Sequence, residues 1–567
     1  MQKRSKRNYI GLLIAAIFVA QIFALPVFGT GIEKSVDETT ATFGDALAYK
    51  SALNTHEADN TTILFFTNNT ILEQTFQSLT AFNISCENIL PGNLSNETAR
   101  EYANQRINDS KIIFLDISNE TQISSISDSL INLNAKIIGI TNLSFTYNNV
   151  NETILSSITE YWGLSEENLR RMSIYIAHEL DNRNDLNVEE PLNTTILLLA
   201  GHNAYVKLLR ELDMSDYNIH FRVLHFTDHY VRENPDTVKE MINEESEIIL
   251  EGAITAPPVT AVEDEILNAS ERGAKVITTV GGITKGKYYG SYNIDNTTVI
   301  DEVIAYWNNP MEINTRRLLI YMAYNLDNRT DLGEYVKSYI EAPNNAIYHP
   351  DAPDIPYKDA YLKHTFLNAT AYFEWYNESG RYDPEKPTIG VLMPADLYFD
   401  TSIPDGIIES IEERGYNAFP CYTHYYGDPI GHFFHADNKT WVDVIISLRT
   451  FQMRNGVETL SEMDTPFLKG VVLYSAQTID EWRNSSFGIS STQICWQFDM
   501  PEMDGAIVPV VIGGIRSKED IDRYPIEERV DKLVDTTISY AELGNKSNSE
   551  KKIALIYFNH PPGKQDV

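Results

Sequence analysis

Residues 194–203 read TTILLLAGHN, and residues 61–69 read TTILFFTNN. Each stretch is a short, nearly continuous apolar run that follows two threonines and ends in small or polar residues. A strand buried on one face only alternates apolar and polar residues, whereas a strand in a parallel sheet is covered by helices on both faces. The two stretches therefore predict buried strands of a parallel α/β sheet.

The likeness of these stretches is part of a longer internal repeat. Residues 170–186, RRMSIYIAHELDNRNDL, recur as residues 316–332, RRLLIYMAYNLDNRTDL, with 11 of the 17 aligned positions identical. Two more pairs of apolar runs repeat in the same order, SKIIFLDI with SEIILEGA and AKIIGIT with AKVITTV. Helix-length segments separate these runs, as in a doubly wound fold. We therefore expect two tandem α/β units, Rossmann-like or flavodoxin-like, over residues 55–190 and 191–340.

A third, looser α/β region follows the repeats. Residues 341–372 are rich in proline and predict a linker. Residues 373–567 contain four further strand candidates, PTIGVLMP, VDVIISLRTF, KGVVLYS and KKIALIYF, the last of which begins at Lys551. Two helices are expected in DGIIESIEERG and RVDKLVDTTISYAEL. We expect this region to form one more α/β domain, truncated at its C-terminus.

The composition limits the classes of function. The chain of 567 residues has 45 basic and 80 acidic side chains, which gives a formal net charge of −35. Nucleic-acid binding needs clustered lysine and arginine to contact phosphates, so this charge argues against nucleic acid as a partner. A hydrophobic fraction of 43% with 11% aromatic residues is enough to form several buried cores.

The first 54 residues predict export from the cytoplasm. Four basic residues among the first seven precede an apolar stretch from Ile10 to Phe28. This pattern is typical of a secretory signal peptide over residues 1–29, and the alternative is an uncleaved membrane anchor. Residues 30–54 then form a leader segment. Many Asn-X-Ser/Thr sequons agree with an extracytoplasmic, glycosylated protein, secreted or membrane-anchored, although a chain rich in these residues also forms sequons by chance.

One loop after a predicted strand offers candidate metal ligands. The sequence CYTHYYGDPIGHFFH contains Cys421, His424, His432 and His435. Thiolate and imidazole are suitable ligands for zinc, cobalt or nickel, so these four residues are the candidate metal site. Their spacing matches no standard zinc finger, and the alternative is that the histidines pack among the aromatic residues of the loop.

Four stretches of the C-terminal region carry more specific motifs. They are WYNESGRYDPEKPTIGVLMP from Trp375, IESIEERGYNAFPCY from Ile408, WRNSSFGISSTQICWQFDMPEMDGAIVPVVIGG from Trp482 and RVDKLVDTTISYAELGNKSNSEKKIALIYFNHPPGK from Arg529. In these motifs and their order, the segment from Glu374 onward resembles the large subunit of cobaltochelatase and the related H-type subunit of magnesium chelatase. PEMDG and FNHPPGK are the most specific blocks. In that family the second block leads into a long further portion, so the resemblance implies an N-terminal part of the subunit.

The resemblance implies insertion of a divalent metal, Co²⁺ or Mg²⁺, into a tetrapyrrole. ATP would be hydrolysed on separate AAA+ partner subunits and not on this chain. The missing C-terminal portion of the large subunit would be a further partner. Such a reaction needs a flat apolar binding surface, ligands for a cation and a base for two pyrrole protons.

The family-matched motifs supply the candidate site residues. On the resemblance, the catalytic candidates are Glu502, Asp504 and His560. The substrate-binding candidates are Trp482, Asn559, Pro562 and Gly563. The structural alternative is that PEMDG forms a buried turn in which Gly505 takes a positive φ. An alternative function from another class is a non-catalytic extracytoplasmic protein that binds a tetrapyrrole or corrinoid, or presents its repeated domains to a partner.

Overall fold

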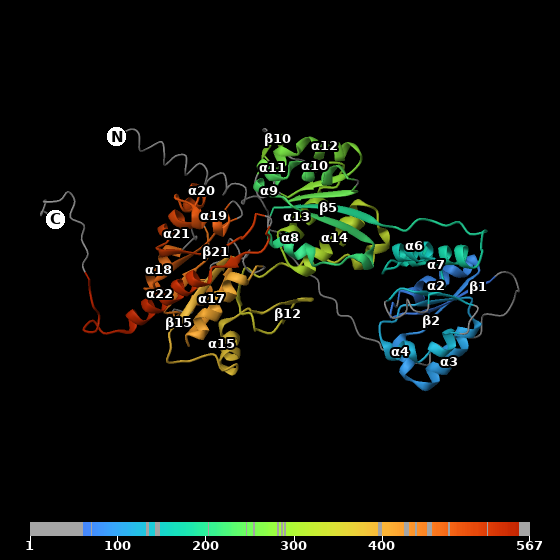
Figure 1. The fold of residues 1–567 in the computed structure, drawn as a ribbon, viewed down its shortest axis with the longest axis horizontal. Coiled ribbons are helices and arrows are strands. Elements are labelled where there is room, and N and C mark those ends of the chain that lie inside the picture. The colour runs from blue at the N-terminus through green and yellow to red at the C-terminus, as the bar shows by residue number, and fades with distance from the viewer. Residues whose placement is uncertain are drawn as a thin grey trace. The chain divides into compact units, whose positions relative to one another are not determined.

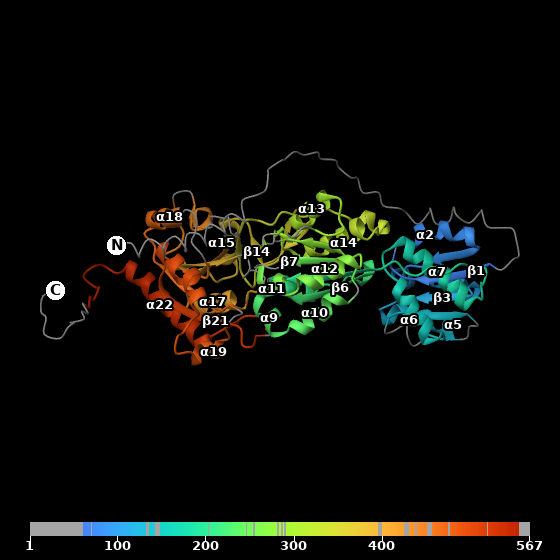
Figure 2. The same cartoon turned by 90° about the horizontal axis from the view of Figure 1, so that it is seen from above.

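The computed structural model (Figures 1 and 2) describes most of the chain between Asn60 and Ala554. The gaps in this range are 70, 132–134, 142–147, 202, 245, 253–255, 280–282, 285–286, 289–290, 395–399, 424–429, 437–438, 451–455, 475–476 and 519. The predicted signal peptide or anchor and the leader segment therefore lie outside the described residues. Within the described part of the chain, no helix is long and apolar enough to cross a membrane.

Two four-stranded sheets correspond to the two copies of the repeat. The first sheet consists of β1 (Thr61–Phe66), β2 (Ile84–Asn88), β3 (Ile112–Leu115) and β4 (Lys136–Gly139). The second consists of β5 (Thr194–Ala200), β6 (Ile219–His225), β7 (Ile248–Gly252) and β8 (Lys275–Thr278). Their spatial orders are β2-β1-β3-β4 and β6-β5-β7-β8, and every pairing is parallel. Both follow the order 2-1-3-4 with which flavodoxin-like sheets begin, which confirms the predicted tandem doubly wound units.

Helices connect the strands of both sheets (Figure 1). In the first they are α2 (Leu72–Leu79), α3 (Glu97–Asp109), α4 (Glu120–Ser124), α5 (Ser127–Ile131), α6 (Glu152–Tyr161) and α7 (Glu166–Leu180), with short turns η2 (Thr80–Phe82) and η3 (Pro91–Ser95). In the second they are α8 (Asn203–Arg210), α9 (Asp228–Glu233), α10 (Pro235–Asn243), α11 (Ala256–Ala261), α12 (Glu263–Glu271), α13 (Thr297–Trp307) and α14 (Glu312–Leu326), with η5 (Ser215–Tyr217) and η6 (Thr330–Tyr335). Two short strands, β9 (Ile283–Thr284) and β10 (Lys287–Tyr288), form a separate antiparallel pair.

The third sheet has eight strands in the order β14-β11-β16-β15-β19-β20-β21-β22. Its members are β11 (Asn345–Tyr348), β14 (Thr365–Phe366), β15 (Thr388–Pro394), β16 (Asn417–Thr423), β19 (Val444–Ser447), β20 (Phe467–Val472), β21 (Ile507–Gly514) and β22 (Tyr524–Pro525). The five central strands are parallel, β11 and β22 pair antiparallel with β16 and β21, and β14 pairs antiparallel with β11. Numbered along the chain, the parallel strands run 2-1-3-4-5, the complete flavodoxin-like order.

Helices cover both faces of the third sheet. They are α15 (Ala369–Glu378), α17 (Ser402–Glu413), α18 (Gly456–Met463), α19 (Ile479–Asn484), α20 (Ser491–Ile494), α21 (Met500–Met503) and α22 (Glu527–Asn545), with π-helical turns η7 (Ile430–Phe434) and η8 (Cys495–Asp499). Alternate residues of β15 divide between two apolar cores, since Val391 packs with α17 and α22 whereas Leu392 packs with α15 and α18. Both faces of these strands are thus covered by apolar side chains, as the continuous apolar runs predict.

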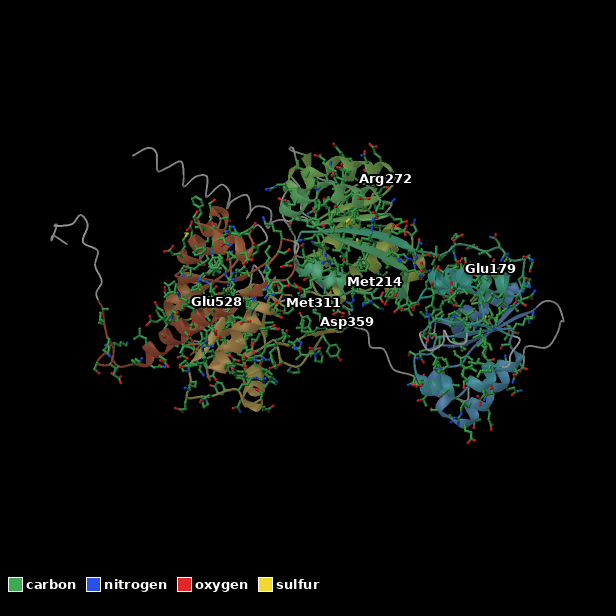
Figure 3. The ribbon with its side chains drawn as sticks, viewed as in Figure 1. Glu179, Met214, Arg272, Met311, Asp359 and Glu528 are labelled. Carbon is green, nitrogen blue, oxygen red and sulfur yellow. The ribbon has the colours of Figure 1, made fainter. Side chains whose placement is uncertain are left out.

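The predicted linker, residues 341–372, contains more structure than its prolines suggest. Strands β11 and β14 join the edge of the third sheet, and β12 (Ile355–Tyr357) pairs with β13 (Ala360–Leu362) in a hairpin. Arg317 donates a hydrogen bond to Asp359 at the hairpin turn, and Leu362 packs with Met311. Asp359 and Met311 are labelled in Figure 3. Prolines in such short, peripheral strands cost few ladder hydrogen bonds, which explains the difference.

The last predicted strand, which begins at Lys551, is not a strand over its described residues 551–554. Ile553 is 92% exposed there. The rest of that stretch lies outside the described residues. A further short antiparallel pair, β17 (His435–Ala436) and β18 (Lys439–Thr440), precedes β19.

By its internal contacts, the chain separates into two compact units. One holds the first sheet and includes residues up to Asn193 together with 215–218. The other holds the second and third sheets. The boundaries predicted at residues 190 and 340 remain predictions.

Several glycosylation sequons have a local structural role. In Asn96, Asn119, Asn151, Asn296 and Asn368, the side-chain oxygen accepts a backbone N–H from the first turn of the helix that follows. Asparagine is among the best N-cap residues because it satisfies one of the unpaired N–H groups of a helix start. Helix capping therefore explains five of the Asn-X-Thr patterns without a glycan, and glycosylation stays a prediction.

The repeated LDNR motif ends the last helix of each repeat. Asn182 follows α7 with a φ of 54°, and Asn328 follows α14 with a φ of 55°. Asparagine tolerates this left-handed conformation better than most residues and often ends a helix in this way. The next residue in both copies is an arginine that contacts the start of its own repeat.

These two arginines form paired contacts with an aspartate two residues later. Arg183 donates through Nε and Nη2 to the two carboxylate oxygens of Asp185 at 2.8 and 2.7 Å. Arg329 binds Asp331 in the same way at 2.9 and 2.8 Å. Both guanidinium groups are buried, but the Asp185 side chain is 63% exposed and that of Asp331 only 2%. We refer to each arginine–aspartate pair as a clamp.

The aspartate of each LDNR motif makes a further contact with the first strand of its own repeat. Asp181 accepts a hydrogen bond from the hydroxyl of Thr61 at 2.7 Å, and Asp327 accepts one from Thr194 at 2.6 Å. Each threonine is the first residue of the first strand in its sheet. The motif thus joins the last helix of a repeat to the beginning of that same repeat, which explains its identity in both copies.

We expect Arg329→Gln to destabilise the protein more than Arg183→Gln. Loss of Arg329 leaves the buried Asp331 carboxylate without its partner, which costs about 3–5 kcal/mol. Loss of Arg183 leaves Asp185 in contact with water, so the cost should be smaller. Hydrogen exchange of peptides from β5 and β1 measures the local free energy of opening in the two sheets separately.

Asp331→Asn should also destabilise the second sheet, and Asp185→Asn is its matched control. Asp185→Asn exchanges a solvated carboxylate and should have little effect, whereas Asp331→Asn weakens a buried pair. Equal loss of protection in β1 and β5 for the two arginine variants would contradict the role assigned to burial.

Lys469 is an exception to the apolar interior of β20. Its side chain is 1% exposed. The ammonium Nζ donates to the carbonyl oxygens of Gly470 at 2.7 Å and Ser447 at 3.5 Å. Burial lowers the pKa of Lys469 to about 7, because the charged form loses its hydration.

We expect Lys469→Met to remove a pH dependence of stability. An unfolded lysine has a pKa of about 10.4, so from about pH 7 upward the unfolded state binds more protons than the folded state. The free energy of unfolding of the unmodified protein should therefore rise with pH relative to the variant, by up to about 1.4 kcal/mol per pH unit. Urea denaturation of both proteins at a series of pH values measures this difference.

Comparing the unmodified protein with Lys469→Met also cancels an opposing pH dependence of stability, which comes from Cys421. Burial raises the pKa of the Cys421 thiol in the same sheet well above its ordinary value. That effect lowers stability at alkaline pH, but it is the same in both proteins. A stability difference that stays constant over the neutral to alkaline range would show that Lys469 keeps its proton on folding.

Candidate functional site

The order of strands places a candidate binding position at the carboxyl ends of β15 and β19. The chain passes from β15 to β16 on one side, and then returns to β19 on the other. In open α/β sheets this reversal leaves a crevice outside the carboxyl ends of the two strands, where ligands bind. Leu448 N–H donates to the Leu392 carbonyl oxygen at 2.8 Å, so the two strands stay together to this end.

Five residues from four segments of the chain lie at this edge of the sheet. They are Asp400, Arg449, Thr450, Tyr474 and Arg523, and we call them the switch-point cluster. Each is at the carboxyl end of a parallel strand or on a connection that returns to that edge. Apart from Tyr474, all are less than one-tenth exposed, with Arg449 at 9% and Arg523 at 7%.

The segment before β22 crosses this edge of the sheet. The Arg523 backbone N–H donates to Asp400 Oδ2 at 3.0 Å, and the hydroxyl of Ser402 donates to Oδ1 at 2.9 Å. The Arg523 guanidinium carbon lies 4.9 Å from the centroid of the Tyr474 ring. Since Asp400 follows β15 and Tyr474 follows β20, Arg523 connects groups on either side of the end of β19.

Side chains also hold the end of β20 in place. Gln497, fully buried in η8, accepts the Val472 N–H at 3.2 Å and donates to the Val472 carbonyl oxygen at 2.6 Å. Gln493 accepts the Tyr474 N–H at 3.2 Å. A π-helical turn within an α-helix is often found at functional sites, because it directs a side chain that the regular helix would not. Here it fixes the backbone that carries Tyr474.

The chemistry of the switch-point cluster is cationic and aromatic. Two buried guanidinium groups present planar sets of N–H donors that suit carboxylates and phosphates. The Tyr474 ring packs edge-on against Trp496, with ring centroids 4.6 Å apart.

The predicted catalytic residues Glu502 and Asp504 lie elsewhere. The PEMDG block ends α21 and precedes β21, so it is at the amino edge of the sheet. β21 spans eight residues, roughly 25 Å, between this block and the carboxyl edge. Glu502 is exposed and Asp504 is 3% exposed.

The backbone of PEMDG forms the turn with a positive φ at Gly505 that was given above as the structural alternative to catalysis. Ala506 N–H donates to the Pro501 carbonyl oxygen, and Gly505 N–H to that of Glu502, both at 3.0 Å. Gly505 has a φ of 91°. These two bonds and the positive φ define a Schellman helix end, which explains a glycine at this position without any catalytic role.

Trp482, a predicted substrate-binding residue, packs on the sheet. It lies on α19 against an apolar cluster that includes Val471 and Val511. The Arg529 guanidinium carbon is 5.0 Å from its ring centroid. No described contact joins it to the switch-point cluster. The other predicted residues of the terminal loop, Asn559, His560, Pro562 and Gly563, lie outside the described residues.

The predicted metal ligands are only partly described. Cys421 is fully buried in the apolar core beneath α15, and burial raises its thiol pKa, which disfavours the thiolate that binds metals. His432 is exposed, and His435 Nδ1 lies 2.9 Å from the Thr440 hydroxyl. His424 lies outside the described residues. Among the residues that the structure describes, no three His, Cys, Asp or Glu side chains are placed to hold a metal.

Sequence reasoning missed the switch-point cluster, although a signal was present. Arg449 and Tyr474 lie near the C-terminal ends of the predicted strand segments VDVIISLRTF and KGVVLYS, and each comes two residues after the end of the observed strand, β19 or β20. Since ligands bind beyond the carboxyl ends of parallel strands, these positions could have been selected. Asp400 and Arg523 come from connections that no sequence pattern marks.

Comparison with known proteins relates the C-terminal part of the chain to a protein family. Residues 304–567 match the family model described as CobN/Magnesium Chelatase. An uncharacterized protein of Methanocaldococcus jannaschii is 29% identical over 297 residues, which cover 47% of this chain and 23% of that protein. The H-type subunit of the magnesium chelatase of Chlorobaculum parvum is 25% identical over 284 residues, or 46% of this chain and 20% of its own length.

A plant relative shows the same partial coverage. The chloroplastic magnesium-chelatase subunit ChlH of Oryza sativa subsp. indica is 28% identical over 247 residues, which cover 39% of this chain and 16% of that protein. The chain therefore spans less than a quarter of the length of each of these relatives. Residues 304–567, which contain the third sheet and the switch-point cluster, belong to the CobN/magnesium chelatase family and are distantly homologous to ChlH and CobN.

Proposed function

We propose that residues 304–567 are part of a metal-chelatase large subunit that holds a tetrapyrrole while a divalent cation is inserted. Co²⁺ or Mg²⁺ is the substrate metal, and ATP is hydrolysed on separate AAA+ subunits. The observation that carries this proposal is the family match, because it covers the whole third sheet. The switch-point cluster is the binding position that the strand order favours.

The residues of the switch-point cluster suit the binding of the macrocycle. A tetrapyrrole is flat and largely apolar, so aromatic side chains such as Tyr474 are suitable contacts. Tyr474 is held by Gln493 through its backbone and by Trp496 through its ring. A contact surface that is fixed before binding loses less entropy when the ligand arrives.

Metal delivery and proton removal need further groups. The described residues contain no three-ligand cluster for a cation. Since the chain covers less than a quarter of its relatives, we assign these steps to the remaining portion of the subunit and to partner subunits. In this proposal, the chain's own contribution is to bind and orient the macrocycle.

A titration with a free-base porphyrin tests the proposal. Purified protein is added to deuteroporphyrin IX, and the absorbance of the macrocycle is followed. We expect a saturable spectral shift, with an affinity that Tyr474→Ala weakens by roughly 2- to 12-fold, because a packed aromatic contact contributes about 0.5–1.5 kcal/mol.

Tyr361→Ala is the matched control. Tyr361 is 67% exposed on the β12–β13 hairpin, so its loss should leave binding unchanged. A flat response of the unmodified protein at micromolar porphyrin would overturn the proposal for this part of the subunit.

The alternative function is non-catalytic capture of a tetrapyrrole or corrinoid outside the cytoplasm. The basic and apolar pattern of residues 1–29 favours it, because an exported protein would not meet cytoplasmic ATP-driven partners. Cell fractionation tests the location. Incubation with porphyrin, Co²⁺ or Mg²⁺, ATP and chelatase ATPase subunits then separates the two functions, since only a chelatase component increases the amount of metalloporphyrin.

A further inference from the structure

We propose that asparagine side chains close the outer edges of the first and second sheets and thereby prevent strands of other chains from adding to them. This device belongs to the repeated units and is independent of the proposed function. In the third sheet the fourth parallel strand, β20, pairs with a fifth strand, β21. In the two repeats the fourth strands, β4 and β8, are at the edge of the sheet.

Two asparagines that follow β4 bond to the side of this strand that faces away from β3. Asn149 Oδ1 accepts the Ile137 N–H at 2.7 Å, and the Asn149 N–H donates to the Ile137 carbonyl oxygen at 3.2 Å. Asn149 Nδ2 donates to the Ala135 carbonyl oxygen at 2.9 Å. Asn148 accepts the Gly139 N–H and donates through Nδ2 to the Gly139 carbonyl oxygen at 3.0 Å. These are the bonds that a neighbouring strand would form.

The bonds on the inner side of β4 show which groups face outward. The Lys136 N–H donates to the Lys111 carbonyl oxygen at 2.9 Å, and the Ile140 N–H to that of Leu115 at 3.0 Å. Successive residues of a strand direct their N–H groups to opposite sides, so Ile137 and the residue two positions later face away from β3. The asparagines therefore bind the groups that an added strand would need.

The second repeat has the same arrangement at the matching position. Val276 of β8 exchanges two backbone hydrogen bonds with Tyr292, at 3.1 and 2.9 Å. Asn293 Nδ2 donates to the Ala274 carbonyl oxygen at 2.9 Å. Ala274 begins the run AKVITTV, which repeats AKIIGIT of the first copy. An asparagine amide thus binds the same carbonyl position in both copies.

An open edge with these sequences would favour association between chains. A strand at the edge of a sheet presents N–H and C=O groups that another strand can bind. β4 and β8 have the sequences KIIG and KVIT, and segments rich in β-branched apolar residues associate readily. Asn149 and Asn293 are exposed, so they can bond to the edge strand and still face water.

Hydrogen exchange of the full chain tests whether the asparagines hold the edge. In the double variant Asn148→Ala, Asn149→Ala, we expect the peptide that contains β4 to exchange faster. The increase should be roughly 2- to 12-fold for each backbone N–H that loses its acceptor. Asn293→Ala should have a smaller effect on β8, because the backbone bonds of Tyr292 remain.

Sedimentation velocity at increasing protein concentration measures association. We expect the double-alanine variant to form dimers and larger species at concentrations where the sedimentation of the unmodified protein does not change. The variant Asn148→Ala, Asn149→Lys lacks the same side-chain bonds, but a charge beside the edge opposes strand pairing, so it should not associate. Asn108→Ala is the matched control, because this exposed asparagine bonds within α3 and not to a strand.

The outcomes decide whether the asparagines close the edge or only stabilise the strand. Association of the double-alanine variant, but not of the lysine variant, supports the proposal. Faster exchange of β4 without association would overturn it, because the asparagines would then only stabilise the strand. Equal association of the alanine and lysine variants would indicate a general loss of structure and would also overturn it. Unchanged exchange would show that the asparagines do not hold the edge.

Discussion

A parallel strand that helices cover on both faces can place polar chemistry only at its ends. In the third sheet, alternate residues of the central strands pack into one of two apolar cores, and residues of β1, β3 and β4 form an apolar core in the first sheet. This constraint also explains why the polar contacts of interest gather at two edges. The helix end of PEMDG lies at the amino edge of the third sheet, and the switch-point cluster lies at the carboxyl edge. Lys469 departs from the rule in the middle of a strand, and burial shifts its pKa accordingly.

Much of the fold could be predicted from this same constraint, because buried strands leave a visible apolar run. The apolar runs predict β1, β3, β4, β5, β7, β8, β15, β19 and β20. The edge strands β2 and β6 were missed, since they are half-buried and their sequences, ISCEN and IHFRVLH, mix polar with apolar residues. β16 contains a proline at position 420 and β21 one at position 509, which hid both strands although each pairs within the sheet. The sequence does not reveal β11 and β14 within residues 341–372, because they are only four and two residues long.

The candidate site was harder to predict than the fold. The resemblance to chelatase subunits drew attention to contiguous motifs, whereas the switch-point cluster combines residues from positions 400 to 523 that only the folded sheet brings together. PEMDG shows that a specific family motif can be explained by backbone geometry, through the positive φ of Gly505 and two helix-end hydrogen bonds. For Asp400 and Arg523 no sequence signal exists, because connections of this kind have no periodic pattern. Arg449 and Tyr474 needed only the rule that ligands bind beyond strand ends.

The repeated LDNR motif joins the last helix of each repeat to the first strand of that same repeat, through the hydrogen bonds of Thr61 to Asp181 and of Thr194 to Asp327. Each repeat is therefore a closed module whose two chain ends are held together. A gene segment that encodes such a module can be duplicated without breaking the contacts of the modules on either side. The closed repeat offers a physical reason why this chain can carry two copies in tandem, each with the same closing residues.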